Sequence, residues 1–205
     1  MIIKNIMKDV IPSIWPLVAF ISMIAITLRC TYLYKNHKKF IFHKELMSLI
    51  FIIYILCMYY ILIRQNVTSG GINLIPFKEM FRYSIGSYKF MKNIVGNIIL
   101  FIPFGFFASY YCNIKSVKSN LLTTLIVSLC VETMQYYIGR IFDIDDIILN
   151  ILGGFLGYLL FICLIAIKEK LPKFMTKDSF INFIAIILII IIVLFSLGIN
   201  IFSYV

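Results

Sequence analysis

Six apolar stretches, each close to the length that crosses a lipid bilayer, limit what this chain can fold into. A helix needs about 20 mainly apolar residues to span the hydrocarbon core. The stretches cover residues 10–28, 46–63, 94–112, 121–138, 147–167 and 180–201. Hydrophobic residues make up 62% of the chain and charged residues 14%, which leaves too little polar surface for a soluble domain. We therefore predict an all-α fold, a polytopic membrane helical bundle of about six transmembrane helices in one membrane domain over residues 1–205.

The charged residues lie in the short connections between these stretches. Lys and Arg outnumber Asp and Glu by 19 to 9, but they are not gathered on one face, so nucleic acid is not a predicted partner. The connections at 29–45, 113–120 and 168–179 hold 11 Lys and Arg, against 8 on the opposite side. The positive-inside rule then places both chain ends and the loops at 64–93 and 139–146 outside the cell. Whichever side that is, an even number of spans lies between these two loops, so both loops lie on the same face of the membrane.

We expect the first apolar stretch, the two His residues and the five Cys residues to have structural or solvent-facing roles. The first apolar stretch is too long for a signal peptide and no small-x-small cleavage site precedes Arg29, so we expect it to remain as a helix. His37 and His43 lie in a basic loop, where water or lipid headgroups are their expected neighbours. The cysteines fall within or at the edges of predicted spans without a CxxC pair, and we expect them to pack: Cys30, Cys57, Cys112, Cys130 and Cys163.

The fourth span carries a carboxylate at membrane depth, where a charge costs about 2.5 to 3.5 kcal/mol on insertion scales. If the helix continues, Glu132, Gln135 and Arg140 share one face at 100° per residue. Arg140 then lies about 12 Å along the axis from Glu132, so contact between them needs Gln135, water or a ligand as a bridge. A helix–helix hydrogen bond from Glu132 to Asn97 or Asn150 is the structural alternative to a functional role.

Three acids directly precede the fifth span. Carboxylates at a helix start are stabilised by unpaired amides and by the helix dipole, so one of Asp143, Asp145 and Asp146 is a predicted N-cap. Asp143 and Asp146 are three residues apart, which suits either an ion pair with Arg140 or a hard cation such as Mg²⁺. Because the sequence offers no further ligand, no metal site is assigned.

Two segments upstream add polar groups that are expected to face this region. The loop at 70–77 contains Asn73 and Pro76 beside two glycines, and we expect it either to dip into the membrane interface or to form a lip that contacts substrate. In the third span, Pro103 removes a backbone hydrogen bond and is expected to bend the helix. Asn97 is expected to point inward.

Small residues on the third and fifth spans predict close helix packing. Gly153 and Gly157 form a GxxxG pattern, which lets another helix approach, and Gly105 lies near the middle of the third span. Asn150 begins the same face as the two glycines. Packing of this face against the third or fourth span is expected to gather five polar side chains around one pocket: Asn97, Glu132, Gln135, Arg140 and Asn150.

Taken in order, three blocks of residues resemble the VanZ-like family of bacterial membrane proteins. The blocks are Asn73–Phe77, Asn97–Gly105, and a third made of Glu132, Gln135, Arg140, Asp143, Asp146, Asn150, Gly153 and Gly157. The resemblance covers roughly residues 70–165, with two N-terminal spans and one C-terminal span as flanking elements. It implies a multi-pass cell-membrane protein associated with low-level resistance to the glycopeptide teicoplanin.

These observations lead to one main functional hypothesis and two alternatives. The main one is a polar pocket at the outer membrane surface that handles an envelope lipid, a lipid-linked cell-wall precursor or the drug. Its core would be Glu132, Gln135, Arg140 and Asp146, and its ligand contacts would be Asn73, Pro76, Asn97, Asp143 and Asn150.

The first alternative is an intramembrane enzyme acting on a lipid-linked envelope substrate, with Glu132 as general acid or base and Arg140 holding a phosphate or carboxylate. No Ser or Cys with a positioned His is visible, which disfavours an acyl-transfer triad. The second alternative is a proton-coupled transporter that titrates at Glu132. The sequence leaves any cofactor unassigned.

Overall fold

The computed structural model describes residues 2–63, 70–84 and 86–196, and most of them are helical. The helices are α1 (Ile2–Lys35), α2 (Phe42–Ile63), α3 (Tyr88–Phe90), α4 (Gly96–Cys112), α5 (Val117–Tyr137), α6 (Ile144–Lys170) and α7 (Asp178–Ser196). Short 3₁₀ and π segments lie at Met80–Arg82 and Met91–Val95, and two short strands are β1 (Gly71–Asn73) and β2 (Ile141–Asp143). The predicted all-α fold is confirmed.

Five helical stretches are long and apolar enough to cross a membrane. They are Pro12–Lys35, Phe42–Ile63, Tyr88–Cys112, Val117–Tyr137 and Ile144–Lys170. A sixth apolar stretch, Asp178–Val193 in α7, is shorter, and the end of the predicted sixth span lies outside the described residues. Over the residues that the structure describes, each predicted span therefore coincides with a helix, and the chain is a helical membrane protein.

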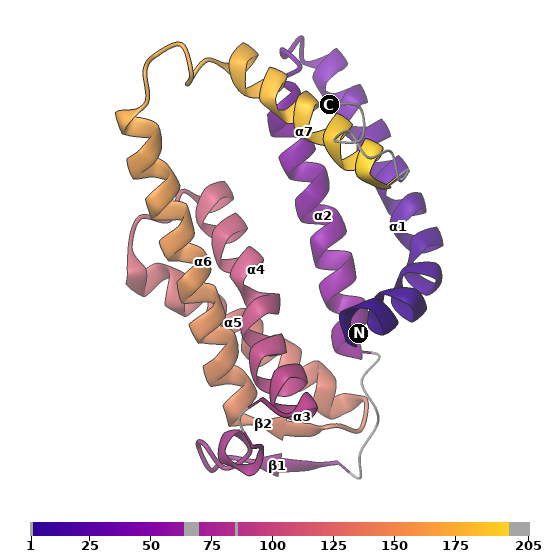
Figure 1. Cartoon of the computed structure of the whole chain (residues 1–205), viewed down its shortest axis with the longest axis vertical. Coiled ribbons are helices and arrows are strands. Elements are labelled where there is room, and N and C mark those ends of the chain that lie inside the picture. The colour runs from indigo at the N-terminus through magenta and orange to yellow at the C-terminus, as the bar shows by residue number, and fades with distance from the viewer. Residues whose placement is uncertain (1, 64–69, 85, 197–205) are drawn as a thin grey trace, which may run out of the picture. The chain divides into compact units, whose positions relative to one another are not determined.

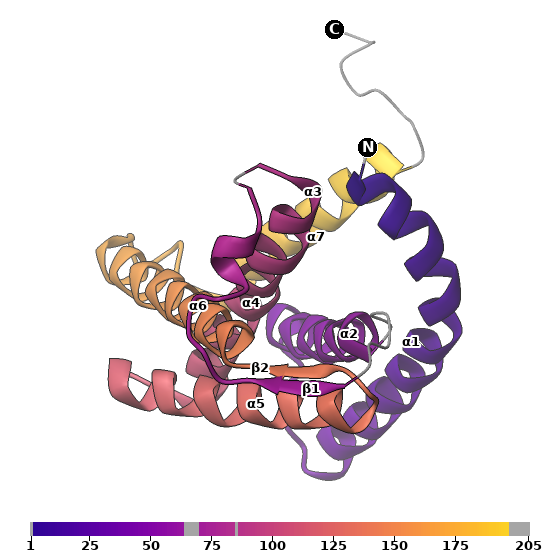
Figure 2. The same cartoon turned by 90° about the horizontal axis from the view of Figure 1, so that it is seen from below.

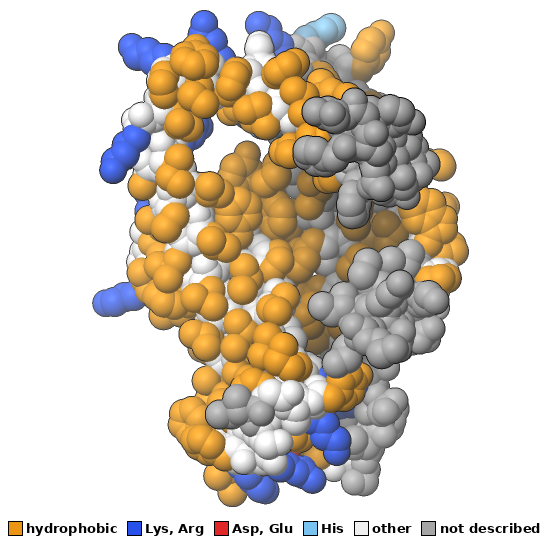
Figure 3. Space-filling model, in the orientation of Figure 1, with side chains coloured by type: hydrophobic (Ala, Val, Ile, Leu, Met, Phe, Trp, Pro, Cys, Tyr) orange, Lys and Arg blue, Asp and Glu red, His pale blue; other side chains and the backbone are white. Residues whose placement is uncertain are grey.

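The chain divides into two compact units. One comprises residues 1–15 and 54–166, and the other comprises residues 16–53 and 167–205. The first unit contains the polar stretch. In it α4, α5 and α6 run side by side, and β1 and β2 lie across one end of them (Figures 1 and 2). The surface of α6 is apolar, with Leu152, Leu156 and Leu160 exposed, and hydrophobic side chains cover this face of α4 and α6 in Figure 3.

Glycines bring the backbones of α4 and α6 into direct contact. A Cβ atom on Gly153 or Gly157 would overlap the backbone carbonyl of Ile98 or Ile102, respectively. A Cβ atom on Gly105 would meet the α6 backbone in the same way. The predicted close approach of a neighbouring helix is therefore correct, and α4 is that neighbour.

Helix α5 buries a polar stripe of which only Glu132 and Gln135 were predicted from the sequence. Its buried members recur every three or four residues, which puts them on one helical face: Asn120, Thr124, Ser128, Glu132 and Gln135. Asn120 donates hydrogen bonds to the Gly105 carbonyl at 3.3 Å and to the Ser109 hydroxyl at 3.0 Å, which ties α5 to α4. Ser128 accepts a hydrogen bond from Asn150 on α6 at 3.0 Å. Polar groups inside and apolar groups outside are expected where the surroundings are hydrocarbon.

The two strands join loops that are far apart in the sequence. They pair in parallel, with Gly71 opposite Ile141 and Asn73 opposite Asp143. The prediction that the loops at 64–93 and 139–146 share one face is confirmed for their described residues. The pairing sets the 70–84 loop over the start of α6, which positions the candidate site.

Proline and π-helical geometry mark the third span. Pro103 lies inside α4 and has no amide hydrogen, which leaves the carbonyl one turn earlier without its helical donor. Next to this break, the Tyr54 hydroxyl donates a hydrogen bond to the Leu100 carbonyl at 2.6 Å. The π segment at Met91–Val95 directly precedes α4 and was not predicted.

Candidate functional site

The polar side chains meet where β2 turns into α6. Seven residues from five segments form this site, here called the polar cluster: Asn73, Asn97, Glu132, Arg140, Asp143, Asp145 and Asp146. The 70–84 loop, here called the covering loop, covers one side, and the remaining residues come from α4, α5, α6 and the connection from α5 through β2.

Asp143 is the N-cap of α6. Its Oδ1 atom accepts a hydrogen bond from the Asp145 amide at 2.9 Å and another from the Asn73 side chain at 2.9 Å. The prediction that one of the three acids caps the helix is confirmed. Burial raises the pKa of the Asp143 carboxyl above its ordinary value, against the lowering effect of these two hydrogen bonds.

Glu132 is buried, with 1% of its surface exposed, and it holds the backbone of β2. Its Oε2 atom accepts a hydrogen bond from the Asp143 amide at 3.1 Å. The expected partners of Glu132 were wrong. Asn97 instead donates to Asp146 Oδ1 at 2.6 Å, and Asn150 donates to Ser128. The chain reverses after α5, which brings the Asp143 backbone amide to the Glu132 carboxylate in place of either amide side chain.

Arg140 lies outside α5, contrary to the helical-face prediction. The helix ends at Tyr137, and Gly139 adopts a φ of 87°, which turns the chain toward β2. The Arg140 guanidinium interacts electrostatically with Glu132 and Asp146. It forms no ion pair within bonding distance with any described residue. Its Nη1 atom is buried and has no hydrogen-bond partner in the described part of the chain. The expected ion pair of Arg140 with Asp143 or Asp146 is therefore wrong.

The Mg²⁺ alternative finds no ligand set. Among the residues that the structure describes, no group of three or more His, Cys, Asp and Glu side chains is arranged to hold a metal ion. Asp143 and Asp146 use their carboxylates for the Asn73, Asp145 and Asn97 hydrogen bonds instead.

Asp145 fixes the covering loop, a role that the sequence analysis missed. Its carboxylate accepts hydrogen bonds from three backbone amides of that loop: Phe77, Glu79 at 2.8 Å and Met80 at 3.2 Å. Phe77 adopts a φ of 65°, which a non-glycine residue takes only when its surroundings hold it there. A local signal did exist, because three acids exceed what one helix cap requires.

Three predicted site residues lie beside the polar cluster rather than in it. Gln135 donates to the Leu62 carbonyl of α2 at 3.4 Å, and Asn150 points to Ser128 deeper in the helices. The Oε1 atom of Gln135 and the Oδ1 atom of Asn150 are buried without a partner among the described residues. Pro76 is exposed in the covering loop. Of the predicted structural residues, Gly105, Gly153 and Gly157 act in helix packing away from the cluster, as described above.

Comparison with known proteins agrees with the family resemblance seen in the sequence. The family model described as VanZ/LLP1 matches residues 51–166, which contain the whole polar cluster. Protein VanZ of Enterococcus faecium is 29% identical over 152 residues, which cover 73% of this chain and 86% of that protein. No solved structure matches significantly. The family match extends over more than half of the chain, and the chain therefore belongs to the VanZ/LLP1 family.

Proposed function

We propose that this VanZ-like protein is a multi-pass protein of the cell membrane that contributes to low-level teicoplanin resistance. In this proposal the polar cluster binds the polar headgroup of an envelope lipid, a lipid-linked cell-wall precursor or the drug at the outer membrane surface. The observation that carries it is the buried Nη1 atom of Arg140, which has no acceptor among the described residues. A related protein named VanZ supports the connection to the family but does not identify the ligand.

An unsatisfied buried donor marks the position of a missing partner. A buried polar group without a hydrogen bond costs about 1 to 3 kcal/mol, and more when it is charged. A phosphate or carboxylate oxygen of a ligand would accept from Arg140, because guanidinium groups bind such oxygens strongly. The neighbouring carboxylates of Glu132 and Asp146 would accept hydrogen bonds from hydroxyl or amino groups on the same headgroup.

The covering loop gives this site an amphipathic edge. Ile72, Leu74, Ile75, Phe77 and Phe81 expose most or about half of their surface, although they lie within a few residues of the cluster. Lys78 is exposed on the same loop, whereas the charge of Arg82 is paired with Glu79 at 3.1 Å; Lys and Arg side chains gather at this end in Figure 3. Apolar and basic side chains together suit the level of the lipid headgroups. A headgroup entering the cluster would leave its acyl chains beside this apolar edge.

A lipid-modifying enzyme is the second candidate. The observation that favours it is the burial of Glu132 beside Arg140 in one cluster, because a desolvated carboxyl next to an anion-binding group suits general acid–base chemistry. Purified protein incubated with labelled envelope lipids separates the two candidates. A product that disappears in the Glu132→Gln variant supports catalysis, whereas lipid that is bound but unchanged supports a binding role.

The resistance proposal is tested in cells that lack the protein and are complemented with variants. We expect Arg140→Ala, Glu132→Gln and Asp146→Asn each to lower the teicoplanin concentration that the cells tolerate, at equal protein levels in the membrane. Arg82→Ala is the matched control, because Arg82 lies in the covering loop but is exposed and already paired with Glu79 at 3.1 Å. Unchanged susceptibility in all three cluster variants, at normal expression, would rule out the proposed role.

A further inference from the structure

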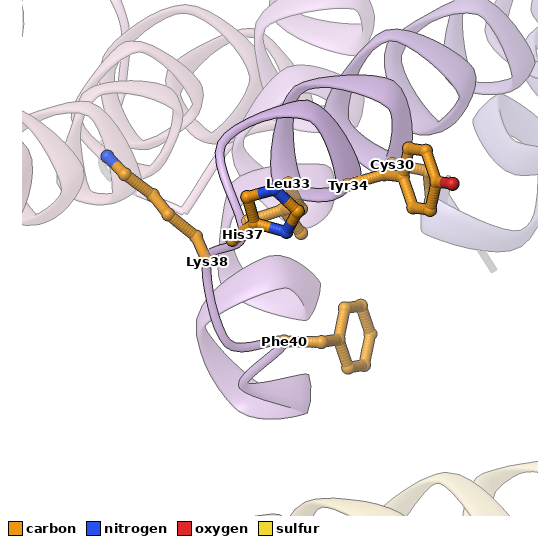
Figure 4. A pocket seen from close by; sticks show the side chains of 6 residues that line it. All are labelled: Cys30, Leu33, Tyr34, His37, Lys38 and Phe40. Carbon is orange, nitrogen blue, oxygen red and sulfur yellow. The ribbon is translucent and has the colours of Figure 1, made fainter.

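A separate hollow lies in the second unit, at the turn between α1 and α2. Its volume is about 480 Å³, and it is lined by Cys30, Leu33, Tyr34, His37, Lys38 and Phe40. Figure 4 shows the rings of Tyr34 and Phe40 on one side of the open space, with the Lys38 side chain extending to the other. The hollow thus combines an apolar wall with a cationic rim.

Positive charge at this turn is not balanced by nearby acids. Residues 30–44 contain four Lys and no Asp or Glu. Lys38 is held in place by the Tyr32 hydroxyl, to which its ammonium donates at 2.8 Å, and its Nζ atom lies 5.0 Å from the centre of that ring. No carboxylate lies within ion-pair distance of Lys38 among the described residues. Its charge is therefore fixed in position and free to meet an anion.

The nearest acids of the unit are already used by other cations. Glu45 accepts two hydrogen bonds from Arg29, at 2.7 and 3.0 Å. Asp178 at the start of α7 lies 3.4 Å from the Lys44 ammonium. The contact between His43 and Asn182, at 2.9 Å, brings the start of α7 to the same end of α2. The preceding connection at 168–177 adds four Lys and one Glu to that end, so the net charge around the hollow stays positive.

We propose that this hollow binds one anionic phospholipid from the adjacent leaflet. The phosphate would lie at the exposed ammonium group of Lys38, and the part of the acyl chain nearest the headgroup would pack between Tyr34 and Phe40. Basic residues at the end of a membrane span recognise anionic lipid headgroups, whereas apolar side chains alone would not distinguish lipids by charge. This inference does not depend on the proposed resistance function, because it concerns the other unit.

The chain contains a single Trp, which allows a local reporter. The full chain with Trp15→Phe and Phe40→Trp is reconstituted in bilayers that contain brominated phosphatidylglycerol or brominated phosphatidylcholine of the same chain length, and quenching of the new Trp is measured. We expect the anionic lipid to be preferred at this position by about fivefold or more, the contribution of one Lys near an anionic headgroup. Lys38→Gln should bring the preference close to equality.

Lys118→Gln is the matched control, because Lys118 is exposed in a different connection. It should keep the preference for the anionic lipid. An equal loss in Lys38→Gln and Lys118→Gln, or equal quenching by both lipids in the parent protein, would overturn the proposal. Inorganic phosphate added at constant ionic strength should leave the quenching unchanged. If it removes the preference, the ligand is free phosphate and not a lipid.

If the reporter variant loses its helical circular dichroism signal, the proposal is tested instead by native mass spectrometry of the chain without the Trp substitutions. The wild-type protein should retain more phosphatidylglycerol than the Lys38→Gln variant. Equal retention by the two proteins would again overturn the proposal.

Discussion

The backbone amide of Asp143 donates a hydrogen bond to the carboxylate of Glu132 at 3.1 Å. Through this bond, a buried side chain of α5 fixes the strand that leads into α6. The same Asp143 caps α6 and binds Asn73 of the covering loop. The Glu132 carboxylate, near the end of α5, therefore holds the residue that joins β2, α6 and the covering loop.

Loss of this acceptor should destabilise the first unit. Glu132→Ala leaves the Asp143 amide without its partner and opens a cavity, so we expect a loss of about 1 to 3 kcal/mol from the unpaired donor alone. Glu132→Gln keeps an acceptor oxygen and should lose less. Unfolding in detergent micelles measures the free energy of unfolding of both variants and of the wild type. Equal stability of Glu132→Ala and wild type would show that the bond is unimportant.

The carboxylate of Asp145 should control the order of the covering loop. Asp145→Asn replaces one acceptor oxygen with a donor, so the amides of Phe77, Glu79 and Met80 lose charge-assisted hydrogen bonds. We expect their hydrogen exchange to become about ten- to a hundredfold faster, the equivalent of one or two such bonds. Hydrogen-exchange mass spectrometry of the peptide containing residues 77–80 provides the measurement. Asp146→Asn is the control and should leave this peptide unchanged, because Asp146 binds Asn97 and not the loop.

Gly157 should tolerate no side chain at the contact between α4 and α6. A Cβ atom there overlaps the Ile102 carbonyl, so Gly157→Ala must push the helices apart at a cost of about 1 to 3 kcal/mol. Gly96→Ala is the matched control, because its Cβ would meet nothing closer than the Met91 carbonyl at 3.7 Å. That variant should be neutral or more stable, since Ala favours helix over Gly. Similar melting temperatures for the two variants would contradict the packing described here.

Stability should depend on pH through Asp143. Its pKa in the folded protein is raised above the ordinary value of 3.8 because burial disfavours the charged form. The contribution of the protonated Asp143 carboxyl to the stability of the fold is therefore fully present below its pKa in the unfolded chain. It is lost as pH rises through its pKa in the folded protein. Asp143→Asn can still accept both hydrogen bonds and should remove this part of the pH dependence. Melting curves of the two proteins across the acidic range check the sign, and a wild type that gains stability relative to the variant as pH rises would contradict it.

The spans and the polar region were predictable because both leave strong signals in the sequence. Long apolar runs located every described helix that can cross a membrane, and Gly153 with Gly157 correctly predicted close packing. The two strands were not foreseen, because three-residue strands such as Gly71–Asn73 carry no periodic pattern.

Partners inside the cluster were harder to predict because a helical wheel assumes a continuous helix. The helix ends at Tyr137, so Arg140 leaves the face of Glu132, and Asp143 reaches that carboxylate through its backbone. The stripe of Asn120, Thr124 and Ser128 was detectable, since it continues the four-residue spacing of Glu132 toward the start of α5. Its small polar side chains drew less attention than the charged ones.

The central proposal is that the buried Nη1 atom of Arg140 donates a hydrogen bond to an acidic group on a ligand. The most direct measurement is mass spectrometry of the envelope lipids that purify with the wild-type protein, with Arg140→Gln and with the exposed control Arg82→Gln. We predict at least one acidic lipid or lipid-linked precursor that is retained by the wild type and by Arg82→Gln but depleted in Arg140→Gln. Identical lipid sets on all three proteins would contradict the account.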